Sequence, residues 1–564
     1  MQLYCAGFTQ GFSTHTLCWA VCCLLATPLA FADTLPSAGS LQQSNQTGRE
    51  FNIPIKPPTS SLPPVQAKQI SSGGATVVVS QFLWVGNSLF SDEVLNRLTK
   101  DMLGRPIDFA KLESAAMSVA NLYRAAGYVV QTKLPTQDIA NGVVTIEITE
   151  ATFGKVLMDG PSSKRVDAKR IRETIYAFQP IGAKLNSNNI DRALAVLSDL
   201  AGIRVNGQLL QGAQAGQTDF VVTTQDLPAI SIDSSADNAG ARSTGQDRVS
   251  LSFKLNSPLR LGDQFTANAM RSKGSDYVRA AYQWPVGHRG WTLGLNGSHL
   301  NYKVTDAAFT ALPLRGSANA FGLETTYPLI WRNRYKLNAV LSWDIKTYEN
   351  LRSEEVVTSY NTRGVNAGLQ GQFSDEWAGG GVSTWQLMGA GGRLKKKTDT
   401  SDSLNTGHFE KIKYNFTRVQ DLSSSMSLHA SLNGQTSKTH LDSSEKFYLG
   451  GMSGVRAYPS SEAGGSAGRL LNIEFRHRLN INNTWFAFYD HGRVVVNPYS
   501  SAALNAFELK GYGLGYGFVS ANGISLKAMV ARRLGRNPNP TSTGQDQDGS
   551  LAMNRFWLNA NWAF

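Results

Sequence analysis

The sequence predicts a transmembrane β-barrel preceded by two small domains that each combine helices and strands. Three observations lead to this fold class: apolar and polar residues alternate with period 2 after Pro228, two consecutive segments before it share one order of elements, and the last strand ends on an aromatic residue. The chain has 564 residues, far more than one domain of roughly 100 to 200 residues. Several domains are therefore expected.

Residues 1–32 are expected to form a signal peptide. Leu17 to Leu29 is mostly apolar, and Ala30-Phe31-Ala32 has the small-x-small pattern of a cleavage site. A transmembrane anchor is the alternative, but it would need about 20 apolar residues. The four cysteines all lie in this segment, so the mature chain is expected to lack disulfides and thiolate metal sites: Cys5, Cys18, Cys22 and Cys23.

Residues 33–72 are rich in Ser, Gln and Pro and are expected to form a linker that buries no core. The part before the prolines, SAGSLQQSNQTGREF, predicts a short polar helix, with a disordered tail as the alternative.

Two repeats follow, which we place at residues 73–152 and 153–228. The first contains a strand after Thr76, a helix from Ser91, a second helix that ends at Gly127, and two strands. The second shows the same order of strand, two helices and two strands. Repetition at this period indicates two tandem α+β modules of one kind.

Residues 229–564 carry the alternation expected of barrel strands. In VSLSFKL, Val249, Leu251, Phe253 and Leu255 point one way and polar residues the other; in YKLNAVLSWDI the odd positions are apolar. A soluble β-sandwich also alternates, but aromatics on one face and ionisable residues on the other favour a barrel with lipid outside and water inside. Short turns and longer polar connections also fit a barrel.

The net charge is +12, and none of it comes from residues 1–32. Such a surplus is also found in nucleic-acid-binding proteins. In an exported chain it fits better with lipopolysaccharide phosphates at an outer membrane or with a cationic conduit. We therefore expect outer-membrane lipid and lipopolysaccharide as partners, and no nucleic acid.

The sequence contains no motif that indicates catalysis. We find no GxSxG elbow and no Rossmann fingerprint in a strand-turn-helix context, and HExxH and the phosphate-binding GxxxxGKS/T loop do not occur. The eight histidines show no ligand spacing. We expect no catalytic residues, no metal site and no cofactor.

A glycine-rich stretch from Ser443 to Leu479 surrounds a single arginine, Arg456. Glycines tolerate positive φ and allow close backbone approach, so this segment is suited to fold into a confined space, although an ordinary exposed loop is the alternative. Asp490 lies in a strand among aromatic residues. A glycine-hinged arginine is suited to pair with it, and two unrelated lumen charges are the alternative.

Five motifs occur in order along the chain: AGSLQQ, YRAAGYVVQTKLPTQDIANGVVTIEITEA, DNAGARSTGQDRV, LGGMSGVRAYPSSEAGGSAG and FYDHG. Together they resemble the outer-membrane transporters of two-partner secretion, the haemolysin secretion/activation family (TpsB; ShlB/FhaC/HecB). The resemblance covers nearly all of the mature chain. Two positions depart from it: Ala457 stands where many members have glycine, and Ala151 where Glu-Gly is common.

The resemblance implies that the repeats are periplasmic POTRA domains and that the barrel has sixteen antiparallel strands. It also implies that a loop at about 448–468 enters the pore, that an N-terminal helix near Ala38 to Gln46 plugs it, and that Arg456 meets Asp490 on the wall. The loop motif comprises Gly450, Gly451, Val455, Arg456, Ala457 and Tyr458, and the wall partner comprises Asp490 and Gly492.

The implied function is export of an unfolded partner of haemolysin or adhesin type, with activation as a further implied step. The POTRA surface around Phe178 and Leu194 is expected to hold the partner's N-terminal secretion domain, and strand addition offers a mode of capture. Phe564 resembles the signal read by the barrel-assembly machinery. The rivals are an insertase of the same superfamily, a general porin and a membrane-embedded hydrolase; two repeats and a proline-rich tether favour export.

Overall fold

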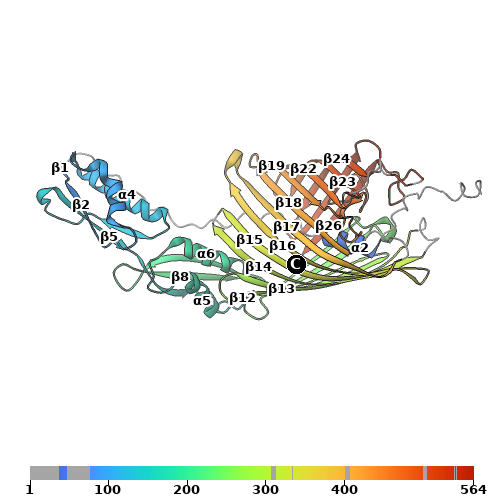
Figure 1. Ribbon diagram of the computed structural model, residues 1–564, viewed down its shortest axis with the longest axis horizontal. Coiled ribbons are helices and arrows are strands. Elements are labelled where there is room, and N and C mark those ends of the chain that lie inside the picture. The colour runs from blue at the N-terminus through green and yellow to red at the C-terminus, as the bar shows by residue number, and fades with distance from the viewer. Residues whose placement is uncertain are drawn as a thin grey trace, which may run out of the picture.

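Two α+β domains extend from one end of a β-barrel, giving an elongated molecule (Figure 1). The computed structural model describes residues 37–47, 76–306, 313–332, 334–399, 407–498, 505–538, 540–541 and 543–564. The expected signal peptide and the proline-rich part of the linker lie outside these residues.

The first α+β domain packs two helices against a three-stranded sheet of order β2-β5-β4. Its elements are β1 (Val77–Val78), β2 (Gln81–Val85), α3 (Asp92–Thr99), η1 (Lys100–Met102), β3 (Pro106–Ile107), α4 (Phe109–Ala125), β4 (Val130–Lys133), η2 (Ala140–Gly142) and β5 (Val143–Glu150). Alternate residues of β5 are buried because one face of the sheet meets the helices. Asp108 caps α4 by accepting from the Lys111 amide, and Gly127 follows the helix with φ of 87°.

The second α+β domain repeats this arrangement. Its elements are β6 (Thr152–Asp159), α5 (Ala168–Phe178), α6 (Ser187–Ser198), β7 (Ile203–Gln211) and β8 (Gln217–Asp226), with sheet order β6-β8-β7. In both domains the first strand runs parallel to the last and the remaining strand is antiparallel to it. The predicted tandem repeat of one α+β unit is therefore present.

Glu150 joins the two domains. Its carboxylate, nearly buried, accepts from the backbone amides of Ser88 and Leu89 and from the hydroxyl of Tyr123. Lys184 of the second domain completes the contact, with its Nζ 2.9 Å from Glu150 Oε2. Burial alone would raise the pKa of Glu150, but the hydrogen bonds from Ser88, Lys184 and Tyr123 outweigh it and lower the pKa to about 2.

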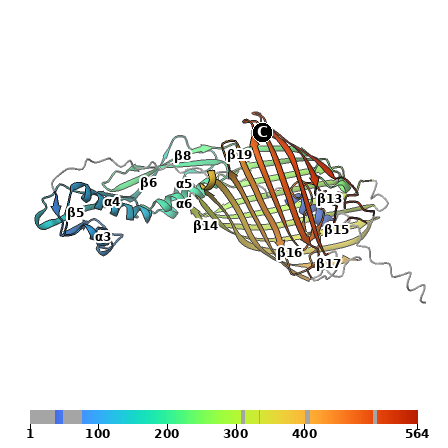
Figure 2. The ribbon, with the colours of Figure 1, turned by 90° about the horizontal axis from the view of Figure 1, so that it is seen from above.

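The strands close into an antiparallel barrel (Figures 1 and 2), and their number, sixteen, is the one that the family resemblance implies. They are β9 (Ile230–Asp237), β10 (Arg248–Asn256), β11 (Gln264–Ser272), β12 (Ser275–Val286), β13 (Trp291–Lys303), β14 (Leu314–Arg332), β15 (Tyr335–Arg352), β16 (Glu355–Asp375), β17 (Gly381–Asp399), β18 (Gly407–Asp421), β19 (Met426–Thr436), β22 (Ala467–Arg478), β23 (Asn483–Val495), β24 (Ala506–Val519), β25 (Ile524–Arg533) and β26 (Asn554–Ala563). Pairing of β26 with β9 closes the ring. Two short 3-10 turns, η3 (Arg242–Thr244) and η5 (Trp377–Gly379), lie in its connections.

The alternation in the barrel strands separates a lipid face from a lumen face. Val249 and Leu251 are 64% and 49% exposed, and Tyr335 and Leu341 are 59% and 50% exposed, because they point outward. The polar neighbours point inward. Exposed apolar residues on an outer wall are the signature of a barrel in lipid.

The second domain contacts the end of the barrel from which both α+β domains extend. Arg170 donates to the carbonyls of Pro285 and Gly287, and Lys336 of β15 pairs with Asp199 at 2.8 Å. This set of contacts ties the domain to the turns at that end. These contacts therefore place the α+β domains at the barrel end that carries these turns.

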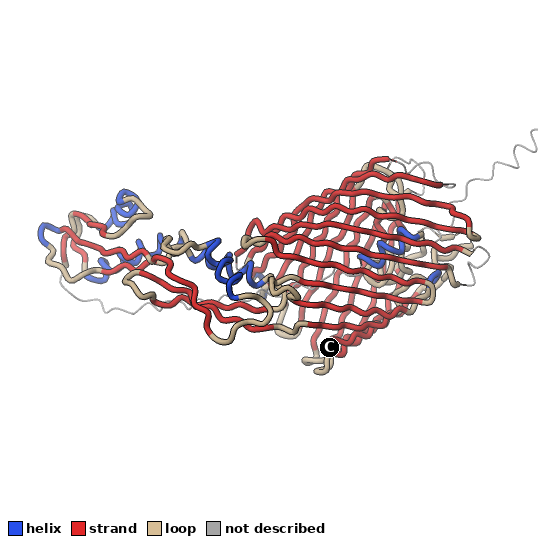
Figure 3. The backbone as a smooth tube through the Cα atoms, turned by 90° about the horizontal axis from the view of Figure 1, so that it is seen from below, coloured by secondary structure: helices blue, strands red, loops and turns tan. Residues whose placement is uncertain are grey.

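Two segments occupy the lumen, and the helix among them is drawn in blue inside the barrel in Figure 3. Helix α2 (Ala38–Thr47) lies inside the barrel against β13, β14 and β15. The connection between β19 and β22, residues 437–466 and hereafter the pore loop, folds back into the barrel and contains the small hairpin of β20 (Phe447–Tyr448) and β21 (Gly464–Gly465). No helix among the described residues is long and apolar enough to cross a membrane.

Candidate functional site

The tip of the pore loop is a compact turn that depends on glycine. The Val455 amide donates to the Leu449 carbonyl at 2.7 Å, which folds the tip back on itself. At Gly450 a Cβ atom would lie 2.1 Å from the Pro459 carbonyl oxygen, and Gly451 has φ of 113°. A side chain at Gly450 would therefore displace the backbone.

The turn presents Arg456 to Asp490 on strand β23. The Arg456 amide and Nε each donate to Asp490 Oδ2 at 3.0 Å, and Nη2 donates to Oδ1 at 2.8 Å. Asp490 is fully buried and Arg456 is 6% exposed. A bidentate pair of this kind is strong and directional, and loss of either partner would leave a buried charge unpaired.

Three further residues complete the arginine site. Glu474 of β22 accepts from Arg456 Nη1 at 2.7 Å, and Asn472 donates to Asp490 Oδ1 at 2.8 Å. The Phe488 ring lies beneath the guanidinium, with its centroid 3.5 Å from Cζ. The positive charge thus meets two carboxylates and an aromatic face.

The rest of the loop tip packs against the last strands of the barrel. Trp557 of β26 donates from Nε1 to the Arg456 carbonyl at 2.7 Å. Tyr458 is fully buried, with the Arg533 guanidinium 4.6 Å from its ring centroid. The loop tip is therefore also held by β25 and β26, the last two strands of the barrel.

Ala457 fits this tip without strain, although the family resemblance implies glycine there. It is fully buried and is not among the residues with positive φ. Its methyl group faces Gly511, where an added Cβ would lie only 2.6 Å away. Gly492 likewise leaves room for Leu449 and Val455. Small residues on the wall accommodate the loop.

The arm of the pore loop that precedes its tip has a second ionic contact with the wall. Glu445 is buried and pairs with Lys411 of β18 at 2.7 Å and with Lys346 of β15 at 3.1 Å. Lys411 also donates to the Glu445 carbonyl. The loop is therefore held to the wall by two charged contacts, one at its tip and one before the tip.

Helix α2 contacts both the barrel wall and this arm. The Ala38 amide donates to Asn350 Oδ1 at 2.9 Å, and the hydroxyls of Ser37 and Ser443 are 2.9 Å apart. At Gly39 a Cβ would lie 2.7 Å from that of Ser444. The helix is thus wedged between wall and loop.

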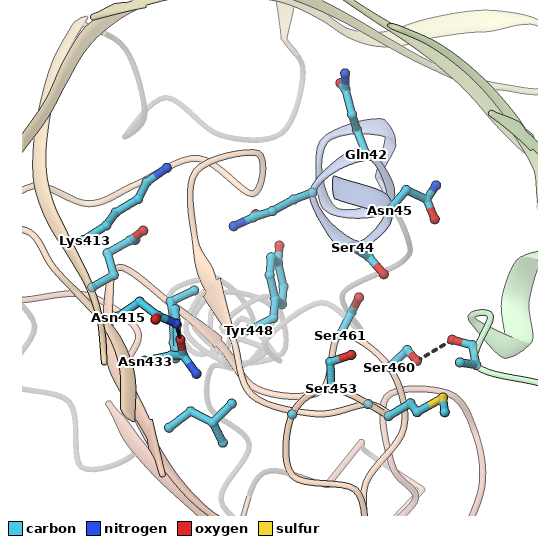
Figure 4. Close-up of a pocket in the computed structure, with 18 of the residues that line it drawn as sticks. Gln42, Ser44, Asn45, Lys413, Asn415, Asn433, Tyr448, Ser453, Ser460 and Ser461 are labelled. Carbon is cyan, nitrogen blue, oxygen red and sulfur yellow. Dashed lines mark hydrogen bonds between the residues drawn. The ribbon is translucent and has the colours of Figure 1, made fainter. Parts of the chain in front are cut away.

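A cavity of about 1170 Å³ remains beside α2 and the pore loop. Figure 4 shows Gln42, Ser44 and Asn45 of α2 on one side and Lys413, Asn415 and Asn433 of the wall on the other, with Tyr448 between them. The lining is polar and includes several amides and lysines. Such a surface suits water or a hydrated chain.

The other predicted site residues lie elsewhere. Phe178 and Leu194 are half-buried against the core of the second α+β domain, and Arg192 stacks over Phe178 with Cζ 5.5 Å from the ring centroid. Phe564 is 60% exposed, and its amide donates to the Ile232 carbonyl at 2.8 Å. Their roles stay predictions.

The sequence reasoning missed Glu474, Phe488, Trp557 and Glu445. Glu474 is a carboxylate on the polar face of an alternating segment, which was a usable signal, and its register places it opposite Phe488. Register between strands cannot be read from one sequence, so its meeting with Arg456 was not predictable. Among the described residues, no group of His, Cys, Asp and Glu is arranged to hold a metal ion.

The sequence profile of the family described as haemolysin secretion/activation protein ShlB/FhaC/HecB matches residues 216–518. The chain belongs to this family. A ShlB-type POTRA profile matches residues 77–151, the first α+β domain. This two-partner secretion transporter is thus an outer-membrane barrel with POTRA domains on its periplasmic side, and the opposite end of the barrel is extracellular.

Relatives of this haemolysin secretion/activation family member are transporters. The chain is 24% identical over 518 residues to the heme/hemopexin transporter protein HuxB of Haemophilus influenzae, covering 88% of this chain and 89% of HuxB. It is 24% identical to the outer membrane transporter CdiB of Dickeya dadantii, covering 68% of each. The solved structure of CdiB from Escherichia coli shares the fold, with a TM-score of 0.75, 17% identity and coverage of 94% and 99%.

Proposed function

We propose that this transporter recognises an unfolded secreted protein in the periplasm and exports it through the barrel lumen. The partner is a haemolysin- or adhesin-type protein with an N-terminal secretion domain, and passage through the pore is coupled to its activation. The chain acts as a conduit and not as an enzyme. The sequence contains no nucleotide-binding motif, so folding of the partner outside the cell supplies the driving force.

The observation that carries this proposal is that helix α2 lies inside the lumen and is joined to the wall by few hydrogen bonds. Only its N-terminal part is apolar, where Ala38 and Leu41 pack against the wall, and it forms single hydrogen bonds to the wall, such as Ala38 to Asn350 and Gln42 to Ser298. Each contributes only about 1 kcal/mol. A polar helix of 10 residues is also marginal by itself, so α2 unravels once it leaves the barrel. It serves as a releasable plug.

The pore loop is the second element that moves in this proposal. Arg456 and Asp490 hold its tip to the wall at rest, and Glu445 holds the arm that precedes the tip. Removal of α2 frees the 443–446 segment on one side and connects it to the cavity of about 1170 Å³. The loop then shifts and opens a path for an extended chain.

Capture of the partner is assigned to the POTRA domains. The described sheet orders leave β2 and β4 of the first domain, and β6 and β7 of the second, with one neighbour each in their three-stranded sheets. Edge strands accept an extended chain through main-chain hydrogen bonds, which demand no particular sequence. The helix surface around Phe178 and Leu194 adds apolar contact.

Deletion of the gene tests the function. Protein in the culture medium is compared between the deletion strain, the strain complemented with the natural chain, and the strain complemented with Arg456→Ala. Only the natural chain is expected to restore a large secreted protein. Unchanged secretion in the deletion strain would refute export by this chain.

The same strains distinguish an exporter from an insertase of outer-membrane proteins. Loss of an insertase lowers the amount of many outer-membrane barrels, whereas loss of this exporter leaves them unchanged. A general fall in barrel proteins would therefore contradict the proposal.

Phe564, at the end of β26, is assigned as the signal for the barrel-assembly machinery, and Phe564→Ser is expected to reduce the amount of this chain in the membrane.

A further inference from the structure

Three strands on the outer wall bring cationic side chains into one row near the extracellular end. Arg363 of β16 is the direct register partner of Arg393 of β17, and Arg393 is the partner of His408 of β18. All three are exposed. Strands β16, β17 and β18 lie side by side in the wall (Figure 1).

These side chains point toward the lipid. Val365 and Leu369 share the parity of Arg363 on β16 and are 48% and 38% exposed, as expected for an outer face. The alternate residue Thr362 is buried on the inner side. Arg393 has the parity of Leu387, which is 50% exposed. The next outward positions below Arg363 and Arg393 are Val365 and Gly391, which are apolar and in register with each other.

The height of the row can be placed against the bilayer. Strand β16 ends at Asp375, and the exposed Trp377 follows it in the periplasmic turn, where interfacial aromatics are common. The stretch from Arg363 to Asp375 is about 40 Å of strand, which at a tilt near 45° rises roughly 30 Å, about one hydrocarbon thickness. Arg363 and Arg393 thus reach the headgroup level of the outer leaflet.

The two arginines face each other without a compensating protein anion. Like charges directly opposite on a sheet are destabilising. Within the described ranges of the chain, neither Arg363 nor Arg393 forms an ion pair or a side-chain hydrogen bond, and Lys395 adds another exposed cation in the next outward position of β17. The nearest outward carboxylate, Glu410, lies one row lower, opposite Gly391, and pairs with neither arginine.

The surface below the row is shallow enough for an acyl chain. Gly389 and Gly391 replace side chains on the outer face of β17, and a Cβ at either position would meet only one backbone oxygen, at 3.7 and 3.9 Å. Ala367 and Ile412 flank Gly389 in register. A cationic pair above an apolar shelf matches a phosphorylated glycolipid, in which a phosphate lies next to the acyl chains.

We propose that Arg363 and Arg393 form a binding site for a phosphate of lipid A, the phosphorylated glycolipid anchor of lipopolysaccharide, on the outer wall of the barrel. Guanidinium groups bind phosphate through paired, charge-assisted hydrogen bonds. The phosphate relieves the repulsion between the arginines, and the acyl chains cover Gly389 and Gly391. Lys395 and His408 flank the site.

Native mass spectrometry of the full-length protein in detergent tests this site, with bis-phosphorylated lipid A as the probe. Arg363→Ser combined with Arg393→Ser is expected to weaken binding about tenfold or more. The matched control combines Arg271→Ser with Arg315→Ser, because these exposed arginines lie at the same barrel end but pair with Asp276 and Glu354. The control is expected to bind like the natural chain.

Two further arms decide the ligand. Lipid A that lacks phosphates is expected to bind the natural protein no better than phosphorylated lipid A binds the Arg363→Ser/Arg393→Ser variant. Phosphatidylglycerol is expected to bind the natural protein about tenfold more weakly than phosphorylated lipid A does. The Arg363→Lys/Arg393→Lys variant keeps the charges and is expected to retain most of the binding, which guards against a folding defect. The proposal would be overturned if the serine variant bound lipid A as tightly as the natural protein does, or if the control variant lost as much binding as the serine variant. Equal affinity of the natural protein for phosphatidylglycerol and lipid A would also overturn it.

Discussion

Arg456 binds Asp490 through three hydrogen bonds, one from its backbone amide and two from its guanidinium. The backbone hydrogen bond fixes the turn of the pore loop, and the guanidinium hydrogen bonds fix the side chain. One carboxylate therefore determines the positions of both the turn and the side chain. Because Asp490 is fully buried on β23, this contact determines where the loop tip lies against the wall.

Replacement of Arg456 by alanine is expected to abolish secretion and leave the barrel assembled. The change removes the cation that pairs with the buried Asp490, which costs about 3 to 5 kcal/mol locally, whereas Glu474 keeps its ion pair with Arg476. The barrel strands keep their hydrogen bonds. Secretion is measured in the medium and assembly by heat-modifiable mobility on gels. Arg456→Lys is expected to restore little, because an ammonium group cannot form the bidentate contact. Full secretion by the lysine variant would show that charge alone suffices.

Gly450→Ala is expected to release the loop tip. The new Cβ would lie 2.1 Å from the Pro459 carbonyl oxygen, a backbone atom that cannot rotate away. We expect a secretion defect of tenfold or more. The control is Gly517→Ala on the wall, where the nearest atom would be 3.8 Å away, and it should secrete normally. Equal secretion by both variants would argue against a fixed tip.

Gly39→Leu is expected to expel helix α2 from the lumen. A Cβ at this position already meets Ser444 at 2.7 Å, and the longer side chain has no space between helix and loop. Planar-bilayer recordings should then show a severalfold higher conductance than the natural chain. Asn45→Ala, which only enlarges the cavity beside the helix, serves as the control. An unchanged conductance of the leucine variant would mean that α2 does not limit the resting pore.

Glu150→Gln is expected to destabilise the POTRA domains at neutral pH by about 2 kcal/mol, because several donors lose a charged acceptor. The pKa of Glu150 is lowered to about 2, so its stabilisation is complete above the ordinary glutamate pKa and is lost as the pH falls toward 2. Calorimetry should therefore show a difference between the natural chain and the variant at pH 7 that shrinks by pH 2. A pH-independent difference would contradict the role of the charge.

The barrel was predictable because lipid contact leaves a strong period-2 pattern. Val249, Leu251, Tyr335 and Leu341 all point outward as the alternation indicates. The strand lengths were not predictable. Strand β16 runs from Glu355 to Asp375, well beyond the membrane, and outside the lipid its outer face is polar, so the contrast between faces disappears.

The site was only partly predictable for a related reason. Arg456 and Asp490 stand out as charges in glycine-rich and aromatic surroundings, whereas Glu445 and Glu474 resemble ordinary lumen residues. Their importance comes from the fold of the pore loop and from the register of β22 with β23, which one sequence does not encode locally. Contacts between distant segments require the three-dimensional structure.

A reversible disulfide between α2 and the pore loop tests the export mechanism most directly. Ser37→Cys and Ser443→Cys introduce thiols where the two hydroxyls are 2.9 Å apart, and all natural cysteines lie within the first 23 residues. Secretion is measured in the oxidised state and after reduction, with each single cysteine variant as a control. If α2 must leave the lumen for export, the oxidised protein secretes nothing and reduction restores secretion. Normal secretion by the fully cross-linked protein would contradict the mechanism.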